Sequence, residues 1–234
     1  MRDSRSILAV VPAHGGSKGI KLKNLLKLDN KTLIEHVANA IRECDFIDEA
    51  VVSTDHELIK EEAVRVGLKA PFRRPKDLLG DFISDIQVLR HAIKECGMIF
   101  NRTFDVILML QPTSPIRSRK QILDCIDSLI ANKLDSCFTV SKTDSKAHPL
   151  KQLRMKDNKI SYYDPEGERI IARQMLGTVY HRNGVCYAFT RKCIMKKGKI
   201  ITDNSSAIVI DEFTVNIDNM YDVRLAELHF KGAL

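Results

Sequence analysis

Short apolar runs alternate with amphipathic segments over most of the chain. The runs carry almost no charge, as strands buried on both faces of a parallel sheet do, and they lie at 7–12, 50–53 and 105–110. Between them, apolar residues recur at helical spacing, which predicts helices at 32–44, 55–66, 82–96 and 118–132. Thr32, with Glu35 completing a capping box, and Asp55 are the predicted N-caps of the first two helices. This βαβ rhythm predicts an α/β fold with a mostly parallel mixed sheet flanked by helices.

The rhythm breaks between about residues 143 and 180. Residues 152–155 and 160–163 flank a polar turn and predict a β-hairpin, which a charged stretch follows. A basic hairpin is poorly suited to a core, so we expect it to project as an arm toward another subunit. Further strands are predicted at 138–140, 185–189, 207–210 and 214–217, and a last helix at 219–230. We therefore divide the chain into an α/β core at 1–141, an inserted arm at 142–182 and the rest of the core at 183–234.

Composition narrows the class of protein. Of the 234 residues, 44% are hydrophobic and 29% charged, which is ordinary for a globular protein and excludes disorder as the main state. No run approaches the length of a membrane span, and residues 2–12 do not resemble a signal peptide, so we expect a cytoplasmic protein that does not engage the membrane. The six cysteines contain no CxxC pair and are interpreted as small buried hydrophobes in a reducing compartment.

The net charge of +7 is unevenly placed. Residues 1–31 carry seven Lys and Arg against two acids, and residues 142–199 carry fourteen against five, whereas residues 201–234 are acidic. Nucleic-acid-binding proteins usually interleave aromatic residues with basic stretches, and the first stretch has no aromatic residue. The pattern therefore favours small polyanionic substrates over nucleic acid.

A glycine-rich loop directly follows the first predicted strand. Loops at the carboxyl ends of parallel strands are where α/β proteins bind ligands, and glycines let backbone amides approach an anion. A hydroxyl and two lysines add donors and positive charge, which together suit a polyphosphate. The alternative is a flexible surface turn, since the spacing is neither a Walker A loop nor a dinucleotide motif. The residues are Ala13, His14, Gly15, Gly16, Ser17, Lys18, Lys23 and Asn24.

A second loop, residues 110–117, follows the buried strand at 105–110. Its two prolines restrict the backbone at the same edge of the sheet. Gln111 can donate and accept hydrogen bonds, and Ser114 and Arg117 can bind oxyanions. A rigid connection without chemistry is an equally good interpretation of this spacing.

Two further groups of residues can carry chemistry. His148 to Lys151, with Arg169, Arg173 and Gln174, offers cations for a carboxylate on the arm, although a solvated basic face is the alternative. Asn216 and Asp218 share one face of the predicted strand at 214–217. A carboxylate there is a natural Mg²⁺ ligand beside a polyphosphate, and it could also cap the last helix, as Asn219 could.

These motifs resemble those of the acylneuraminate (CMP-sialic acid) cytidylyltransferases. The glycine-rich loop follows that family's A-R-x-x-S-K-G-x-x-x-K-N signature, and Leu-Gln-Pro-Thr-Ser-Pro-Ile-Arg at 110–117 is its second specific element. The resemblance covers about residues 7–230. The other matching pieces, in the family's order, are Arg74-Pro75 with Asp81, His148 to Lys151, Arg173-Gln174, Asn183-Gly184 with Tyr187, and Ile217-Asp218.

The resemblance implies a Rossmann-like nucleotidyltransferase fold and a homodimer whose arm reaches the neighbouring active site. It implies a reaction of CTP with an acidic nine-carbon sugar, a nonulosonic acid, which gives the CMP-sugar and pyrophosphate. The glycine-rich loop, with Ser17, Lys18, Lys23 and Asn24, would hold the phosphates, and Arg74 with Asp81 would lie near the base and ribose. Gln111 and Ser114 would belong to the sugar site, where Gln111 orients the sugar. The sugar site would be completed by Asn183 and Tyr187, together with Lys151 and Arg173 of a partner subunit. Asp218 would bind Mg²⁺.

Three positions depart from the family pattern. His14 stands in place of Arg, His181 stands near an Arg of some members, and Asn216 replaces a second metal carboxylate. These changes bear on which acid sugar is used and how Mg²⁺ is held. Two other functions stay open: a nucleotidyltransferase of the same fold for another sugar acid or a sugar-1-phosphate, and a degenerate homologue that only binds nucleotide.

Overall fold

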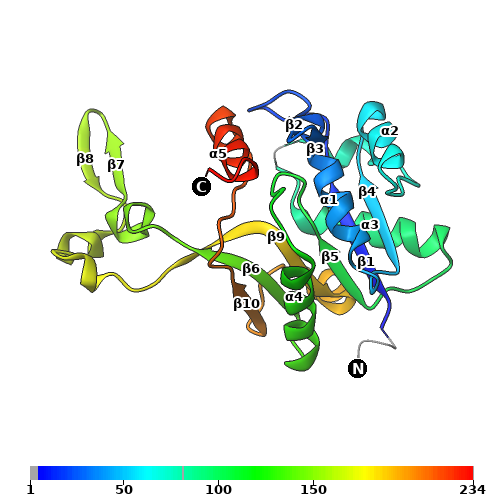
Figure 1. Ribbon diagram of the computed structural model, residues 1–234. Helices are drawn as coiled ribbons and strands as arrows, with labels where there is room; N and C mark the ends of the chain where they lie inside the picture. The colour runs from blue at the N-terminus through cyan, green and yellow to red at the C-terminus, as the bar shows by residue number, and fades with distance from the viewer. Residues whose placement is uncertain (1–4, 81, 234) are drawn as a thin grey trace.

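The computed structural model describes residues 5–80 and 82–233 (Figure 1). Within them, one six-stranded sheet has the order β10-β6-β9-β5-β1-β4, and two small two-stranded sheets pair β2 with β3 and β7 with β8. The strands are β1 (Ile7–Pro12), β2 (Lys27–Leu28), β3 (Lys31–Thr32), β4 (Glu49–Ser53), β5 (Val106–Met109), β6 (Ser136–Lys142), β7 (Leu153–Lys156), β8 (Lys159–Tyr162), β9 (Tyr180–Thr190) and β10 (Ser205–Val209). The α-helices are α1 (Leu33–Arg42), α2 (Glu57–Arg65), α3 (Asp85–Ile99), α4 (Arg119–Ala131) and α5 (Met220–Phe230).

The main sheet is mixed and mostly parallel, as the sequence predicts. Strand β1 pairs in parallel with β4 and β5, and β10 pairs in parallel with β6. Strand β9 runs antiparallel between β5 and β6 and joins the two parallel sets. The parallel strands β1 and β5 therefore present their carboxyl ends at one edge, and β9 enters the sheet at that same edge.

Helices cover both faces of the sheet (Figure 1). Along β1, Ile7, Ala9 and Val11 pack into one core with α1, α2 and α4, whereas Leu8 and Val10 pack into a second core with α3. This alternation is what a strand buried on both faces requires. A third, smaller cluster packs α5 against β2 and the start of α1 through Leu28, Leu33, Val223 and Ala226.

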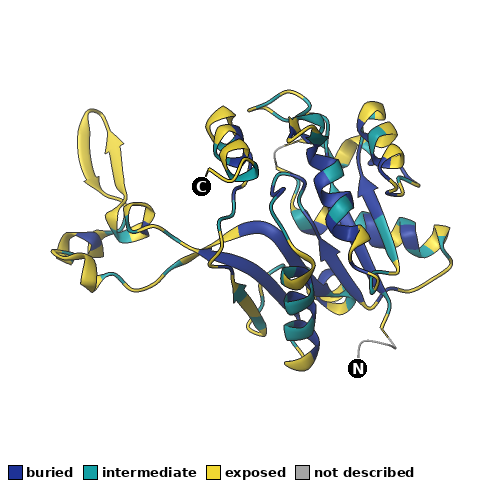
Figure 2. Cartoon of the chain, viewed as in Figure 1, coloured by how far each residue is buried: buried dark blue, intermediate teal, exposed yellow. Residues whose placement is uncertain are grey.

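Residues 142–180 project from the main body (Figure 1). The hairpin β7–β8 that the sequence predicts is present, with Leu153 opposite Tyr162 and Lys156 opposite Lys159. Every residue of both strands is exposed, including Met155 at 75% and Ile160 at 69% (Figure 2). The hairpin therefore has no core of its own, and its apolar side chains are exposed.

Three local predictions are wrong. The second helix begins at Glu57 after His56, not after Asp55, because the Asp55 carboxylate is engaged elsewhere. The third helix begins at Asp85 after a Ser84 capping box and continues past Gly97 to Ile99, whereas Phe82 is fully exposed. Residues 214–217 form no strand in the described chain, because the segment crosses beside the loop after β5 without a neighbouring strand.

The cysteines fit the prediction: all six are unpaired with one another and buried. Among the described residues, no helix has both the length and the apolar character needed to cross a membrane.

Candidate active site

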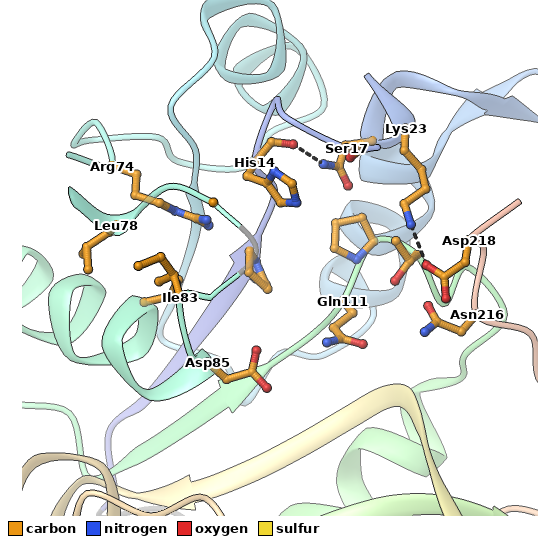
Figure 3. Close-up of a pocket in the computed structure, with 16 residues that line it drawn as sticks. His14, Ser17, Lys23, Arg74, Leu78, Ile83, Asp85, Gln111, Asn216 and Asp218 are labelled. Atoms are coloured by element: carbon orange, nitrogen blue, oxygen red, sulfur yellow. Dashed lines mark hydrogen bonds and ion pairs between the residues drawn. The ribbon is translucent and has the colours of Figure 1, made fainter. Parts of the chain in front are cut away.

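A cleft of about 320 Å³ opens at the edge of the sheet where β1 and β5 end (Figure 3). This is the position at which open α/β sheets bind ligands. The predicted residues that line it are His14, Ser17, Lys23, Asn24, Arg74, Gln111, Asn216 and Asp218. Sequence segments separated by up to about two hundred positions thus converge on one hollow.

The glycine-rich loop is held by its own neighbours. The buried Asn24 side chain donates to the His14 carbonyl at 3.0 Å, and the Gly16 amide donates to His14 Nδ1 at 3.1 Å. The Gly15 amide donates to Asp55 Oδ1 at 2.9 Å, which explains why Asp55 does not cap α2. His14 therefore acts as a hydrogen-bond acceptor at Nδ1.

Two of the loop glycines are required by close approaches. A Cβ at Gly19 would overlap the carbonyl oxygen of Asp218, and a Cβ at Gly15 would lie 2.8 Å from His56 Cβ. The loop thus passes directly against the C-terminal segment that carries Asp218. Ala13 is fully buried at the end of β1, and Lys18 is exposed and does not line the cleft.

Lys23 and Asp218 form an ion pair across the cleft, with 2.7 Å between Lys23 Nζ and Asp218 Oδ1. The lysine side chain is 14% exposed and the carboxylate is 67% exposed. The Ile217 amide, which donates to the Thr113 carbonyl at 2.7 Å, fixes the segment that carries Asn216 and Asp218. Both side chains face the cleft, as the alternating pattern predicts, although the segment is not a strand.

Arg74 is a buried cation at the opposite side of the cleft from Asp218 (Figure 3). Its guanidinium donates to the hydroxyl of Ser53 at 3.1 Å and to the carbonyl of Ser53 at 2.6 Å. Burial lowers the pKa of Arg74, and the charge of Asp55 opposes that shift. A buried cation held by neutral groups can still gain from an anionic or polar ligand.

The loop after β5 is locked by Arg117, whose guanidinium donates to the carbonyls of Gln111 and Ser114. Burial lowers the pKa of Arg117 to about 10. The fully buried Ser114 donates to the carbonyl of Asn183 at 2.8 Å, so it joins the loop to β9. Arg117 and Ser114 thus hold Gln111 at the cleft and do not reach into it.

Asn183 and Tyr187 lie in the core and not on the wall of the cleft. Asn183 accepts from Thr139 at 2.7 Å and donates to Ser141 at 3.1 Å, and the Tyr187 hydroxyl accepts from the Gly184 amide at 2.7 Å. Burial raises the pKa of Tyr187 to about 12. In this structure their hydrogen bonds stabilise β9 near Gly184, where the pairing with β6 shifts register; Gly184 has a φ of 76° and lies against Gln111 and Ser114.

Lys151 and Arg173 are exposed on the arm and do not line the cleft of their own chain. Asp81 lies outside the described residues. The structure adds Leu78, Ile83 and Asp85, which line the cleft beside Arg74 and below His14 (Figure 3). Sequence reasoning missed them, because Leu78 lies in an irregular stretch and the helical spacing at 82–96 does not mark Ile83 or Asp85 as part of a cleft wall.

A mostly parallel sheet with a lysine-bearing glycine-rich loop after its first strand, facing a carboxylate across a cleft, defines a nucleotidyltransferase of the Rossmann-like α/β type. The chain belongs to the cytidylyltransferase family, whose sequence pattern matches residues 8–205. It is 31% identical over 226 residues to a pseudaminic acid cytidylyltransferase of Campylobacter jejuni, covering 96% of both chains. It is 29% identical to a CMP-N,N'-diacetyllegionaminic acid synthase of Legionella pneumophila, covering 91% of this chain and 90% of the relative.

The fold is also similar to that of a solved CMP-2-keto-3-deoxy-manno-octonic acid synthetase complexed with CTP. The TM-score is 0.73, the sequence identity is 15%, and the match covers 98% of this chain and all of the other. At that identity the likeness concerns the fold alone. It confirms the predicted Rossmann-like nucleotidyltransferase architecture.

Proposed function

We propose that this cytidylyltransferase transfers CMP from CTP to a nonulosonic acid and releases pyrophosphate. The observation that carries the proposal is the cleft itself, which brings Lys23, Asp218, Arg74 and Gln111 together at the carboxyl ends of β1 and β5. The names of the pseudaminic and legionaminic relatives, matched over nearly the whole chain, support an acidic nine-carbon sugar as the second substrate.

The two sides of the cleft suit different parts of CTP. Leu78 and Ile83 offer apolar surface beside Arg74, which favours the base and ribose there (Figure 3). Ser17 and Lys23 lie on the other side, and Asn24 follows Lys23 in the chain (Figure 3). Their hydroxyl, ammonium and amide groups are donors that favour the phosphates. The α-phosphate would then lie between Lys23 and Gln111.

In the proposed reaction, the anomeric hydroxyl of the sugar attacks the α-phosphorus, and the bond from that phosphorus to the pyrophosphate oxygen breaks. Gln111 orients the hydroxyl, and the hydroxyl proton is lost to water. Negative charge builds on the departing pyrophosphate, and the ammonium of Lys23 is placed to stabilise it.

The donor set at Asp218 fits Mg²⁺ that arrives with the triphosphate. Mg²⁺ prefers oxygen ligands, keeps several waters and takes further ligands from substrate phosphates. Asp218 offers a carboxylate and Asn216 an amide oxygen on the same wall, although the described residues contain no group of three or more His, Cys, Asp or Glu suited to a metal ion. When bound, the ion would neutralise phosphate charge beside Lys23.

We further propose a cytoplasmic homodimer in which the arm of one subunit completes the cleft of the other. Lys151 and Arg173 are cations on the exposed arm and would meet the sugar carboxylate there. The outward apolar side chains of the hairpin, such as Met155 and Ile160, favour burial against a partner.

A pyrophosphate-release assay with CTP and a panel of nonulosonic acids tests the function. We expect release with CTP and at least one nonulosonic acid, and little release with other nucleotides or with sugar-1-phosphates. Pyrophosphate release only with a sugar-1-phosphate would replace this proposal with another nucleotidyltransferase reaction. Binding of CTP with no release from any sugar would indicate a degenerate homologue.

A further inference from the structure

Asp85 stands between the cleft and a second hollow. Asp85 lines the cleft together with Gln111, and the same residue also lines a neighbouring hollow of about 380 Å³. The other walls of that hollow include Ile86 at the start of α3 and the stretch from Gly198 to Ile201. Ile86, Ile200 and Ile201 make much of this second hollow apolar.

Arg182, which lies near the start of β9 where the arm ends, forms an ion pair with Asp85. The distance from Arg182 Nη1 to Asp85 Oδ2 is 3.5 Å, and the guanidinium lies over the Tyr187 ring, 5.7 Å from its centroid. Arg182 belongs to β9, which in Figure 3 runs below Gln111 and Asp85. The Asp85 side chain is 33% exposed, so it is ordered by Arg182 and still open to a ligand.

A carboxylate in this cleft disfavours the binding of two anionic substrates. It repels the phosphates and the sugar carboxylate. The guanidinium of Arg182 offsets part of that repulsion, and a hydrogen bond from a donor on a substrate would offset more. Gln111 and Asp85 lie on the same side of the cleft, away from the phosphate side at Ser17 and Lys23 (Figure 3). Donors on the ribose and base are the alternative, and the position of Asp85 beside Gln111, which would orient the sugar, favours a donor on the sugar.

An acylamido group on the sugar matches both the Asp85 carboxylate and the apolar hollow beside it. Its N–H is a donor for the Asp85 carboxylate, and its acyl carbon chain is apolar and matches the hollow beyond. We propose that Asp85, positioned by Arg182, binds the N–H of an acylamido substituent on the sugar, and that the acyl group enters the hollow lined by Ile86, Ile200 and Ile201. This inference rests on the proposed function, because it concerns the sugar of that reaction.

The test is steady-state kinetics on an N-acylated nonulosonic acid and on the same sugar with a hydroxyl in place of the acylamido group. Asp85→Ala should raise the KM for the acylated sugar about tenfold or more, the usual effect of losing a hydrogen bond to a charged group, and leave the KM for CTP unchanged. Asp85→Asn, which keeps an acceptor oxygen, should fall between Asp85→Ala and wild type. Ile201→Ser should reduce the preference for the acylated sugar by roughly fourfold, the effect of one buried methylene.

Asp124→Ala is the matched control. Asp124 is also ion-paired, to Lys120 at 2.5 Å, and its side chain is 37% exposed, but it lies on α4 outside both hollows. The negative charge of Asp85 also stabilises α3, because it lies in the first turn of that helix. Melting temperatures of the variants therefore separate a folding defect from a binding defect. If Asp85→Ala folds less well, Asp85→Asn carries the test.

The inference is overturned if the Asp85 variants raise the KM for CTP and not that for the sugar, since Asp85 would then face the nucleotide. It is overturned equally if both KM values and the sugar preference stay at wild-type levels. A wrong proposed function would give a different result, because the wild-type protein would then release no pyrophosphate from CTP with either sugar.

Discussion

Lys23 and Asp218 neutralise each other across the cleft, with their charged atoms 2.7 Å apart. The glycine-rich loop supplies the lysine and the C-terminal segment supplies the carboxylate, and the two chain segments touch where Gly19 meets the Asp218 carbonyl. In the proposed reaction the two side chains have different ligands, a phosphate for Lys23 and a metal ion for Asp218. Binding of Mg²⁺ and CTP therefore has to separate the pair, and each member gains a partner of opposite charge.

Lys23→Ala should impair chemistry far more than folding. Exposed and partly exposed ion pairs contribute little to stability, so the melting temperature should stay within about 2 °C of wild type. Losing a charge aimed at the transition state should lower kcat by roughly 10² to 10³. Lys21→Ala is a matched control, because Lys21 is exposed and does not line the cleft. Wild-type turnover in Lys23→Ala would remove the phosphate role from this loop.

The Mg²⁺ requirement should depend on Asp218 and respond to Asn216. Asp218→Asn should nearly abolish metal-dependent turnover, because it removes the carboxylate from this wall of the cleft. Asn216→Asp adds a second anionic oxygen beside the first and should lower the Mg²⁺ concentration that gives half-maximal rate. A Mg²⁺ titration of wild type and both variants at saturating CTP measures this.

The alternative for Asn216 is a fit to the sugar or to a metal-bound water. Asn216→Asp would then lower kcat and leave the Mg²⁺ requirement unchanged. An unchanged metal dependence in Asp218→Asn would contradict the metal assignment as a whole.

The parts of the fold that follow from local pattern were predictable. The buried runs at 7–12 and 105–110 became central strands, and the glycine-rich loop lies where the end of β1 places it. The alternation at 214–217 correctly predicted that Asn216 and Asp218 share a face, whereas the alternating residues Val215 and Ile217 are buried. It could not predict that no strand would pair with this segment, because pairing depends on distant neighbours.

The roles of other residues depend on tertiary contacts and could not be predicted from local sequence. Asp55 has the sequence context of a helix cap, yet its carboxylate accepts from Gly15, forty positions away. Asn183 and Tyr187 match motif positions, but their polar atoms are engaged inside the core. Asp85 is paired with Arg182, nearly one hundred positions later, and no local pattern marks that contact.

The buried His36 should make stability fall in mild acid. Burial lowers the pKa of His36 below 6.5, and its hydrogen bond to the Leu28 carbonyl, 2.9 Å long, opposes the shift. Since the folded pKa is depressed, the unfolded chain takes up the proton first, so stability is lost as the pH falls below the unfolded value. His36→Gln can keep a donor for Leu28 and should show a smaller drop in melting temperature between about pH 7 and 5. Parallel profiles for both proteins would contradict this.

Mixed dimers test whether the arm of one subunit completes the cleft of the other. Arg173 is exposed and lies outside the cleft of its own chain, and Ile171 nearby is 89% exposed. A hairpin with fully exposed strands gains little by projecting into solvent, but the arm gains apolar burial and a ligand for its cations if it lies on a second subunit. Both Lys23→Ala and Arg173→Ala should therefore be inactive as homodimers.

Mixing the two inactive proteins should restore activity. In a mixed dimer, one cleft has an intact Lys23 and receives an intact Arg173 from the other chain, whereas the second cleft lacks both. With free exchange, half of the dimers are mixed, so the recovered rate should approach about a quarter of wild type. Lys156→Ala is the control, because Lys156 is an exposed cation on the same arm and has no proposed contact with the sugar. Subunit exchange is followed separately by a tagged chain. If the subunits exchange and no activity returns, the arm of one chain does not complete the cleft of the other.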